Sequence, residues 1–462
     1  MNIDNLNDKQ KEAVLYNDGP LLIIAGAGAG KTKTLTTKIA YLIEEKYATP
    51  YNVLAITFTN KAAKEMKDRL YAMLGDVAKK IQVSTFHSFG LKLLRENFEL
   101  LGYDRNFVIM DSDDSLTVVK KIIKDLGYDP KVYNPKAIRN KISSCKNEMI
   151  SAKAYERYAV SDYEQVIHKI YEKYEDKLYQ NNSVDFDDLL LLPIKLFKEN
   201  PDVLERYQDL YQYILIDEYQ DTNQAQYILT KLISEKNRRI TCVGDDSQSI
   251  YSFRGANYKN ILNFEKDYPD AKTILLEQNY RSTSTILDAA NQVIKNNSQR
   301  KDKKLWTDRG TGEKIKYYRA YNERDEAQYV IRKIKELVNK GTEYKDIAIL
   351  YRTNAQSRVV EEEMLKENLP YRVIGSFYFY SRKEIKDLIA YLRLIHNSKD
   401  NISLLRVINT PKRGIGLKTI ENLTSKADEE GISIYDAINS GKELEFKNTI
   451  EKLKIVAEDL TL

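Results

Sequence analysis

The sequence predicts an α/β protein whose main domain is built on a parallel sheet. Short apolar runs alternate with helical patterns over the first hundred residues. This alternation stops between residues 109 and 183, where charged segments rich in Tyr and Lys have helical periodicity, and it then returns. Strands that alternate with helices favour a parallel sheet with helices on both faces. The middle segment is therefore expected to be a helical insertion.

The elements of this main domain follow from the positions of the apolar runs. The expected strands are 21–24, 53–57, 81–84, 214–216, 240–243 and 273–276. Helices are expected to begin near Lys31, Lys61 and Phe89. Because the last three strands lie beyond the insertion, the domain is predicted to be discontinuous, with residues 1–108 and 184–278 on either side of an insertion at 109–183.

A second α/β segment is expected from residue 279 to 381. Its predicted strands are 315–319, 347–351 and 371–374, and its predicted helix is 325–339. Residues 382–462 have helical patterns again. Roughly three or four domains of 100–150 residues fit a length of 462 residues, and the patterns above divide the chain into four.

Composition excludes several classes of protein. No apolar run approaches the roughly 18 residues that span a membrane. The N-terminus does not resemble a signal peptide, and two cysteines, Cys145 and Cys242, fit a reducing cytoplasm rather than a disulfide framework. Three scattered histidines argue against a Cys/His zinc site. The net charge of +5 permits a nucleic-acid partner without requiring one.

A phosphate-binding loop is predicted where the first strand meets the first long helix. Residues 23–32 read IIAGAGAGKT, so small residues precede Lys31 and Thr32. Such a loop lets backbone N–H groups approach phosphate, with the lysine on the β/γ-phosphates and the threonine hydroxyl on Mg²⁺. The strict pattern has Gly where this chain has Ala25. The alternative is a Gly/Ala-rich helix-entry turn with an exposed lysine, but three alternating glycines cost conformational entropy without a ligand.

An acidic pair follows the predicted strand 214–216. Asp217 can reach a metal ion and Glu218 can orient or deprotonate the attacking water, as a magnesium-dependent nucleotide hydrolase requires. Gln220 points more narrowly to motors that move on nucleic acid. An acidic turn is the alternative for this pair taken alone. With the loop at Lys31, it completes a nucleotide hydrolase site.

Further motifs occur in a fixed order along the chain. They are LNDKQ at 6–10, TFTNKAA at 57–63, TFHS at 85–88, DFDD at 185–188, GDDSQSIYSFRG at 244–255, QNYRS at 278–282, YRTN at 351–354, RKEIKD at 382–387 and TPKRGIG at 410–416. From about residue 4 to at least 425, this order resembles the UvrD/PcrA/Rep-type superfamily-one DNA helicases, and most of all their PcrA-type members. The implied fold is a P-loop NTPase (RecA-like) motor domain with a helical insertion, a partial second RecA-like domain and a partial helical fourth domain.

The resemblance implies ATP and Mg²⁺ as cofactors. Gln10 would read the adenine edge and Tyr280 would stack on adenine, with Gln248 sensing the γ-phosphate and Arg281 neutralising its charge. The implied catalytic residues are Lys31, Asp217, Glu218, Gln248 and Arg281, with Thr32 and Asp217 on the metal ion. The implied nucleotide-binding residues are Gln10, Ala25, Gly26, Ala27, Gly28, Ala29, Gly30, Lys31, Thr32, Lys33, Tyr280 and Arg281. Lys33 stands where the family usually has Arg.

The resemblance also implies a DNA-binding set. Its members are Phe58, Thr59, Asn60, Thr85, His87, Phe186, Tyr251, Phe253, Arg254, Arg352 and Asn354. Phe253 stands where the family commonly has Trp, which offers more stacking surface. Ordinary helix capping is the alternative for the Thr59 and Thr85 motifs, a structural histidine for His87, and a core aromatic for Phe186. The turn at 410–416 would either touch duplex phosphate or be purely structural.

The implied function is that of an ATP-dependent 3′→5′ DNA helicase or translocase in repair or replication. Its implied partners are single-stranded DNA, single/double-strand junctions and repair or replication-initiator proteins, and it would be cytoplasmic and a monomer or weak dimer. The family's later motifs, including a second γ-phosphate arginine, do not occur here, so the chain is expected to be truncated. Two alternatives stay open: an ATP- and DNA-binding module without unwinding, and a helicase–nuclease subunit of the AddA type. Mismatch repair, excision repair and plasmid replication all remain open as pathways.

Overall fold

The computed structural model describes residues 3–249, 257, 259–297, 303–374 and 383–459. The chain forms two compact units, one of residues 1–312 with 393–462 and the other of residues 313–392. The fourfold division predicted from the sequence stays a prediction. Among the described residues, no helix is long and apolar enough to cross a membrane.

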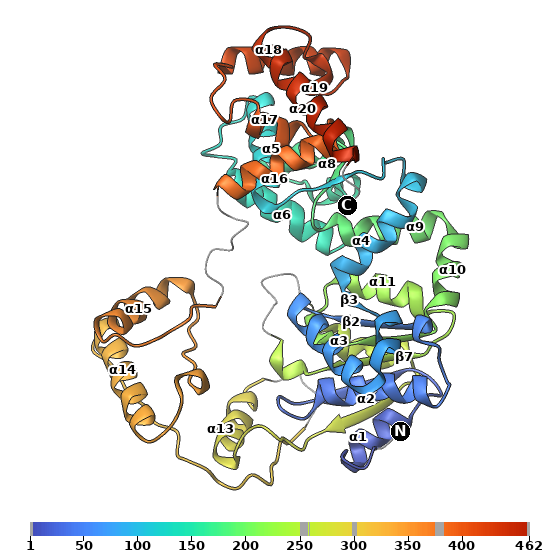
Figure 1. The fold of residues 1–462 in the computed structure, drawn as a ribbon. Coiled ribbons are helices and arrows are strands. Elements are labelled where there is room, and N and C mark those ends of the chain that lie inside the picture. Colours follow the sequence, from blue (N-terminus) through green and yellow to red (C-terminus); the bar gives the residue numbers. More distant parts are fainter. Residues whose placement is uncertain (1–2, 250–256, 258, 298–302, 375–382, 460–462) are drawn as a thin grey trace. The chain divides into compact units, whose positions relative to one another are not determined.

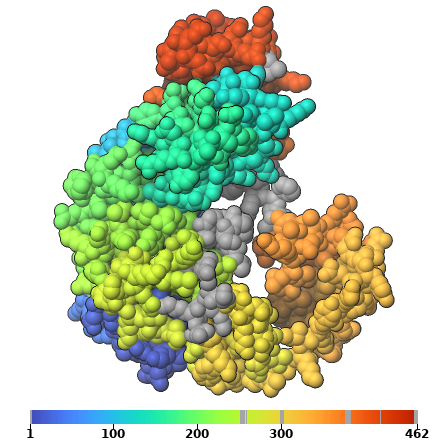
Figure 2. All heavy atoms as spheres, turned by 180° about the vertical axis from the view of Figure 1, so that it is seen from behind, coloured from blue at the N-terminus to red at the C-terminus, as the bar shows by residue number. Residues whose placement is uncertain are grey.

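A six-stranded parallel sheet organises the first unit, in the order β3-β2-β6-β7-β1-β8 (Figure 1). The strands are β1 (Leu21–Ala25), β2 (Val53–Thr57), β3 (Gln82–Thr85), β6 (Tyr213–Ile216), β7 (Ile240–Gly244) and β8 (Lys272–Leu276). All six predicted strands are confirmed within a residue or two. Segments distant in sequence thus lie side by side, as the blue and yellow-green surfaces of Figure 2 show.

Two apolar layers cover the sheet because successive strand residues point to opposite faces. Leu22 and Ile24 pack into one core cluster, while Leu21 and Ile23 pack into the other. The helices of this part are α1 (Asp8–Leu15), α2 (Lys31–Glu44), α3 (Asn60–Leu74), α4 (Phe86–Asn97), α9 (Asp188–Glu199), α10 (Pro201–Leu210), α11 (Gln224–Ser234), α12 (Lys259–Asp267) and α13 (Ser284–Ile294). Helix α4 begins three residues before the predicted Phe89, because Thr85 caps its N-terminus.

The insertion is helical, as predicted. Its helices are α5 (Ser112–Asp125), α6 (Pro135–Asn147), α7 (Ala152–Tyr155) and α8 (Asp162–Gln180), around their own apolar core. The chain enters through β4 (Val108–Ile109) and leaves through β5 (Ser183–Val184), which pair with each other. The C-terminal helices α17 (Asn401–Val407), α18 (Leu417–Glu430), α19 (Ile434–Ala437) and α20 (Gly441–Asp459) also belong to the first unit.

The second unit differs from its prediction. Helices α14 (Glu323–Asn339) and α15 (Ser357–Lys366) pack together around Ile331, Ile334 and Met364, and α16 (Lys383–His396) begins within this unit. The predicted strands at 315–319, 347–351 and 371–374 do not form. A strand needs a neighbour for its ladder of hydrogen bonds, and none of these described segments has one. Tyr317 and Leu350 are accordingly 86% and 93% exposed.

Candidate nucleotide site and nucleic-acid contacts

The loop between β1 and α2 has the backbone of a phosphate cradle. Gly28 and Gly30 have φ values of +72° and +82°, in the left-handed region that favours glycine. A Cβ at Gly28 would lie 2.7 Å from the Asn279 Nδ2 atom, and one at Gly30 would lie 2.7 Å from the Gln10 Nε2 atom. Glycine is therefore favoured at residues 28 and 30 by both backbone conformation and close packing. Helix α2 begins directly after Gly30, so its N-terminal N–H groups face the loop.

The acidic pair meets this loop, as the sequence predicted. Lys31 Nζ donates to Glu218 Oε2 at 2.9 Å, and Thr32 Oγ1 donates to Asp217 Oδ2 at 3.2 Å. Strand β7 separates β1 from β6, so the pairs form because parallel strands present their carboxyl ends at one edge of the sheet. Glu218 has a φ of +53°, an uncommon backbone conformation for a non-glycine residue.

Negative charge is concentrated at this edge. Burial raises the pKa of Asp217 to about 6, helped by the charge of Glu218 and opposed by that of Lys31. Burial and Glu218 likewise raise the pKa of Asp221 to about 6. Oxygen ligands with surplus negative charge suit Mg²⁺, which is usually held by one or two carboxylates together with substrate phosphates. The donors of Thr32 and Asp217 therefore fit the predicted ion, while no cluster of three or more His, Cys, Asp or Glu side chains suited to a metal occurs among the described residues.

Gln220 connects the acidic pair to the loop after β7. Its Nε2 donates to Glu218 Oε2 at 2.9 Å, and its Oε1 accepts from the Asp245 N–H at 2.9 Å. The Asp245 carboxylate in turn accepts from the Gln248 side-chain amide. A Cβ at Gly244 would lie 2.6 Å from Gln220 Oε1, so glycine leaves room for this bridge. Gln248 is thereby linked to Glu218 through two intermediate residues.

The residues predicted to bind the nucleobase, Gln10 and Tyr280, also contact this loop. Gln10 is 1% exposed, and its Nε2 donates to the Ala29 carbonyl at 3.0 Å. Gln10 is also the N3 residue of a capping box with Asn7, so this buried side chain has a local structural role beside its contact with the loop. Asn7 Nδ2 donates to the Tyr280 hydroxyl at 2.8 Å. Lys33 turns away to the Asn5 carbonyl, at 2.9 Å.

The segment of Tyr280 and Arg281 is attached to the loop through its backbone. The Tyr280 N–H donates to the Gly28 carbonyl at 2.9 Å, and Asn279 Nδ2 donates to the Ala27 carbonyl. Arg281 follows directly and its side chain is exposed, with its Cβ close to Gly28. All five predicted catalytic residues thus follow the carboxyl ends of β1, β6, β7 and β8, with Lys31 as the first residue of α2.

Most of the described DNA candidates on the first unit lie at two helix starts. The Thr59 hydroxyl accepts from the Ala62 N–H and caps α3, followed by exposed Asn60. The Thr85 hydroxyl accepts from the Ser88 N–H and caps α4. Phe58 is half-buried. Helix capping is therefore a role that both threonines have in this structure.

Phe186 is exposed rather than a core aromatic. Its side chain is 57% exposed and stacks on His87, with ring centroids 4.0 Å apart and planes 23° apart. Burial lowers the pKa of His87 to about 4, so this imidazole is neutral at physiological pH. A neutral ring stacked on an exposed phenyl group makes an apolar platform that a base can extend.

The other predicted DNA residues are not part of these groups. Tyr251, Phe253 and Arg254 lie outside the described residues. Arg352 and Asn354 belong to the unit of residues 313–392, where both are exposed.

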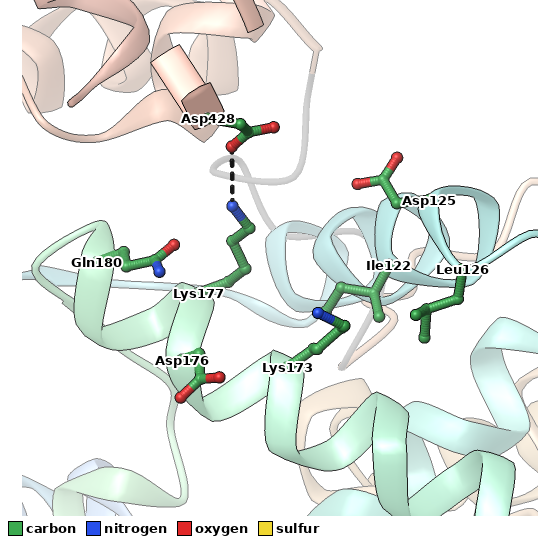
Figure 3. Close-up of a pocket in the computed structure, with 8 residues that line it drawn as sticks. All are labelled: Ile122, Asp125, Leu126, Lys173, Asp176, Lys177, Gln180 and Asp428. Carbon is green, nitrogen blue, oxygen red and sulfur yellow. Dashed lines mark hydrogen bonds and ion pairs between the residues drawn. The ribbon is translucent and has the colours of Figure 1, made fainter. Parts of the chain in front are cut away.

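A hollow of about 280 Å³ lies elsewhere in the first unit, where α5 and α8 meet Asp428 of α18 (Figure 3). Lys177 donates to Asp428 at 3.1 Å across its mouth. The lining is mostly charged and polar, and it includes none of the predicted site residues. The candidate nucleotide site, at strand ends and helix starts, is thus separate from this hollow.

The sequence interpretation gave no contacts to Gln220, which it took only as a mark of nucleic-acid motors, and it gave no role to Asp245 or Lys303. Gln220 and Asp245 stand inside recognised motifs, so their position beside Glu218 and Gln248 was an available signal. Lys303 pairs with Asp245 and Asp246, but it lies among other lysines and more than fifty residues from its partners. Only the fold reveals it.

Comparison with known proteins decides the family. The model of the UvrD/REP helicase N-terminal domain matches residues 6–269, and that of the UvrD-like helicase C-terminal domain matches residues 274–458. The chain belongs to the UvrD/REP helicase family. This assignment confirms the predicted P-loop NTPase fold class, and it accounts for the order of the motifs.

Relatives within the UvrD/REP family are similar over most of the chain. The protein named ATP-dependent DNA helicase PcrA of Staphylococcus aureus is 52% identical over 94% of this chain. Those of Bacillus subtilis and Staphylococcus epidermidis are 51% identical over 99% and 94% of it. The chain spans 60–63% of the length of these relatives. This coverage does not support the prediction of a truncated product.

Proposed function

We propose that this chain is an ATP-dependent DNA helicase or translocase that moves 3′→5′ on single-stranded DNA in repair or replication. The observation that carries the proposal is the continuous network from Lys31 through Glu218, Gln220 and Asp245 to Gln248. It joins the phosphate loop to the loop whose later residues are expected to face DNA. Similarity to proteins named ATP-dependent DNA helicase PcrA supports the same assignment.

Lys31 and Glu218 have complementary roles in the proposed hydrolysis. They form an ion pair at 2.9 Å. When phosphate enters the loop, Lys31 has donors for the β/γ-phosphate oxygens, which frees Glu218 to accept a proton from the attacking water. Gln220 keeps the Glu218 carboxylate oriented during this exchange. Arg281 then offsets the charge that develops on the transferred phosphoryl group.

Thr32 and Asp217 would hold Mg²⁺. When bound, this ion neutralises charge on the nucleotide phosphates. The raised pKa of Asp217, which follows first from burial, supports a cation requirement at this position.

The proposed DNA partner is a single strand, or its junction with a duplex. The exposed Phe186–His87 stack supports base stacking, and the two capped helix starts at Thr59 and Thr85 present N-termini that favour phosphate. A cytoplasmic location fits the two cysteines, which are both buried and unpaired with each other. Repair or replication-initiator proteins as partners, and a monomer or weak dimer, remain part of the proposal.

The test uses the 462-residue chain with a 3′-tailed duplex and a matched 5′-tailed duplex. We expect ATP hydrolysis that increases on addition of single-stranded DNA, and separation of the 3′-tailed duplex only. Separation of the 5′-tailed duplex instead would overturn the polarity. Absence of DNA-stimulated hydrolysis would overturn the motor assignment for this chain.

A second candidate is an ATP- and DNA-binding module without unwinding. It is favoured by the second unit, whose predicted strands at 315–319, 347–351 and 371–374 do not form among the described residues. Nucleotide and DNA binding without strand separation in the same assays would select this candidate. Strand separation at rates matched to ATP hydrolysis would remove it.

A further inference from the structure

Lys303 is a buried cation next to the nucleotide site that no motif assigns. Its side chain is 5% exposed, and its Nζ contacts both Asp245 Oδ1 and Asp246 Oδ1. These carboxylate side chains are 3% and 0% exposed. Lysine is almost never buried to this degree unless it is paired, so these contacts determine where the Lys303 side chain lies.

Asp245 is the branching point of the site network. Its carboxylate accepts from the Gln248 side chain, from the Ser247 N–H at 3.0 Å and from Lys303. Its own N–H donates to Gln220, which in turn holds Glu218. The orientation of the Asp245 carboxylate therefore sets the position of Gln248.

The backbone around Lys303 is attached to the segment that carries Arg281. The Trp306 N–H donates to the Glu277 carbonyl at 3.1 Å, and the Asn279 N–H donates to the Trp306 carbonyl at 2.7 Å. Asn279 also donates to the Ala27 carbonyl of the phosphate loop. One short segment thus contacts the phosphate loop through Asn279 and the Asp245 loop through Lys303.

We infer that Lys303 is a positioning residue for ATP hydrolysis, tying the Tyr280–Arg281 segment to the Asp245–Gln248 loop so that Gln248 and Arg281 keep a fixed relative placement. The inference rests on the proposed function. Without the ammonium group, the two adjacent buried carboxylates repel each other, and the Asp245 carboxylate turns away from Gln248. The Gln248 amide then loses its charged acceptor.

The chain offers a matched control. Lys304 is adjacent, its side chain is exposed, and its backbone N–H donates to Glu277 Oε1 at 2.8 Å. Lys304→Met removes the same charge without disturbing Asp245. Lys303→Arg keeps the charge and tests whether the ammonium position or its charge matters.

The first test measures steady-state ATP hydrolysis with single-stranded DNA. We expect Lys303→Met to lower kcat about 10–100-fold, the effect of losing one hydrogen bond to a charged group, with KM for ATP changed by less than about threefold. Lys303→Arg should restore most of kcat, and Lys304→Met should match the parent. The double variant Lys303→Met with Asp245→Asn should lose no more kcat than the worse of the two single variants, because both changes act through the Asp245 carboxylate.

Equal kcat in Lys303→Met and Lys304→Met would overturn the inference. Losses of kcat that add up in the double variant with Asp245→Asn would also overturn it. The same holds if the loss of kcat in Lys303→Met equals the fraction of that variant that is unfolded.

A second test does not depend on turnover, so it separates this inference from the proposed function. Amide hydrogen exchange is followed in the peptide that contains Ser247 and Gln248, whose N–H groups donate to Asp245. We expect faster exchange there in Lys303→Met and parent-like exchange in Lys304→Met. Unchanged exchange in Lys303→Met would overturn the inference even if the chain hydrolyses ATP. Faster exchange in a chain without hydrolysis would support the positioning contact and overturn only the proposed activity.

Discussion

Lys146, at the end of α6, is a buried cation whose removal should destabilise the fold. Its side chain is 0% exposed, and its Nζ lies 2.8 Å from oxygens of Glu175, Asp185 and Asp188. Burial alone would raise the pKa of Asp185, but the charge of Lys146 outweighs it and the pKa lies below its usual value. Burial, followed by the charge of Asp185, raises the pKa of Asp188 well above its usual value.

This network supports the Phe186 platform. Asp185 and Asp188 exchange backbone-to-carboxylate hydrogen bonds at 2.9 and 3.0 Å across the turn that leads into α9, and Phe186 lies within this turn. Lys146 comes from the insertion, so it holds this turn from a different part of the first unit. Loss of Lys146 should therefore disturb both folding stability and the Phe186–His87 stack.

Lys146→Met removes the cation and leaves its buried carboxylates in place. Breaking a buried pair by removing one partner costs about 3–5 kcal/mol, because the remaining charge stays buried without compensation. We expect this loss in the free energy of unfolding of the part that contains the insertion. Adding Asp188→Asn should recover part of it, since one unpaired carboxylate is neutralised.

The assay is urea denaturation followed by far-ultraviolet circular dichroism, at constant pH and salt. The control is Lys136→Met, on the exposed side of the same helix, whose expected effect is within about 0.5 kcal/mol. Binding of a short single strand reports on Phe186, and affinity should fall in Lys146→Met but not in Lys136→Met. Equal stability of Lys146→Met and Lys136→Met would refute this expectation. It would mean that removing a fully buried cation with three carboxylate partners leaves the free energy of unfolding unchanged.

Three further predictions concern the sites directly. Glu218→Gln keeps the shape of the side chain but cannot accept the proton of water, so hydrolysis should fall at least about 100-fold while binding of a fluorescent ATP analogue persists; comparable turnover would remove Glu218 as the base. Gly28→Ala should weaken that binding, because its Cβ would meet Asn279, whereas Gly75→Ala has a similar φ of +62° and open space and should bind normally. His87 is neutral when folded down to pH about 4 but takes up a proton near pH 6.5 when unfolded, so stability falls as pH falls through this range. Between pH 7 and 5 the parent should lose about 2 kcal/mol relative to His87→Phe, which keeps the stack without titrating; parallel pH profiles would contradict the buried, neutral imidazole.

Local patterns sufficed for the main sheet and the chemical core of the site. Most of its strands, such as β1, β2 and β6, are short apolar runs whose successive residues pack into opposite clusters, and this signal is present in the sequence itself. The glycines before Lys31 and the acidic pair Asp217–Glu218 after β6 could likewise be recognised from the sequence, because each motif consists of consecutive residues. The pairings of Lys31 with Glu218 and Thr32 with Asp217 follow once both strands are known to end at one edge.

The second unit shows where local patterns fail. Residues 347–351 have the composition of a strand, and Ile347 and Ile349 do pack against helices, yet Leu350 is 93% exposed. Strand formation depends on a partner that supplies backbone hydrogen bonds, and composition does not report whether that partner is present. The sequence left Phe186 open between a base-stacking residue and a core aromatic, because the aspartates around it do not show which neighbours cover the ring; at 57% exposure the core alternative is excluded.

The sequence by itself determined the parallel sheet, the phosphate loop and the acidic pair, since each is written in consecutive residues with a known local geometry. Only the tertiary structure decided which distant side chains complete them: Gln220 and Asp245 as the bridge to Gln248, Lys303 paired with Asp245, and Lys146 paired with Asp185 and Asp188. The physical reason is that ion pairs and hydrogen bonds between distant segments depend on burial and on angstrom-scale distances. The sequence around Lys303, which includes other lysines, shows neither its burial nor its distance from Asp245.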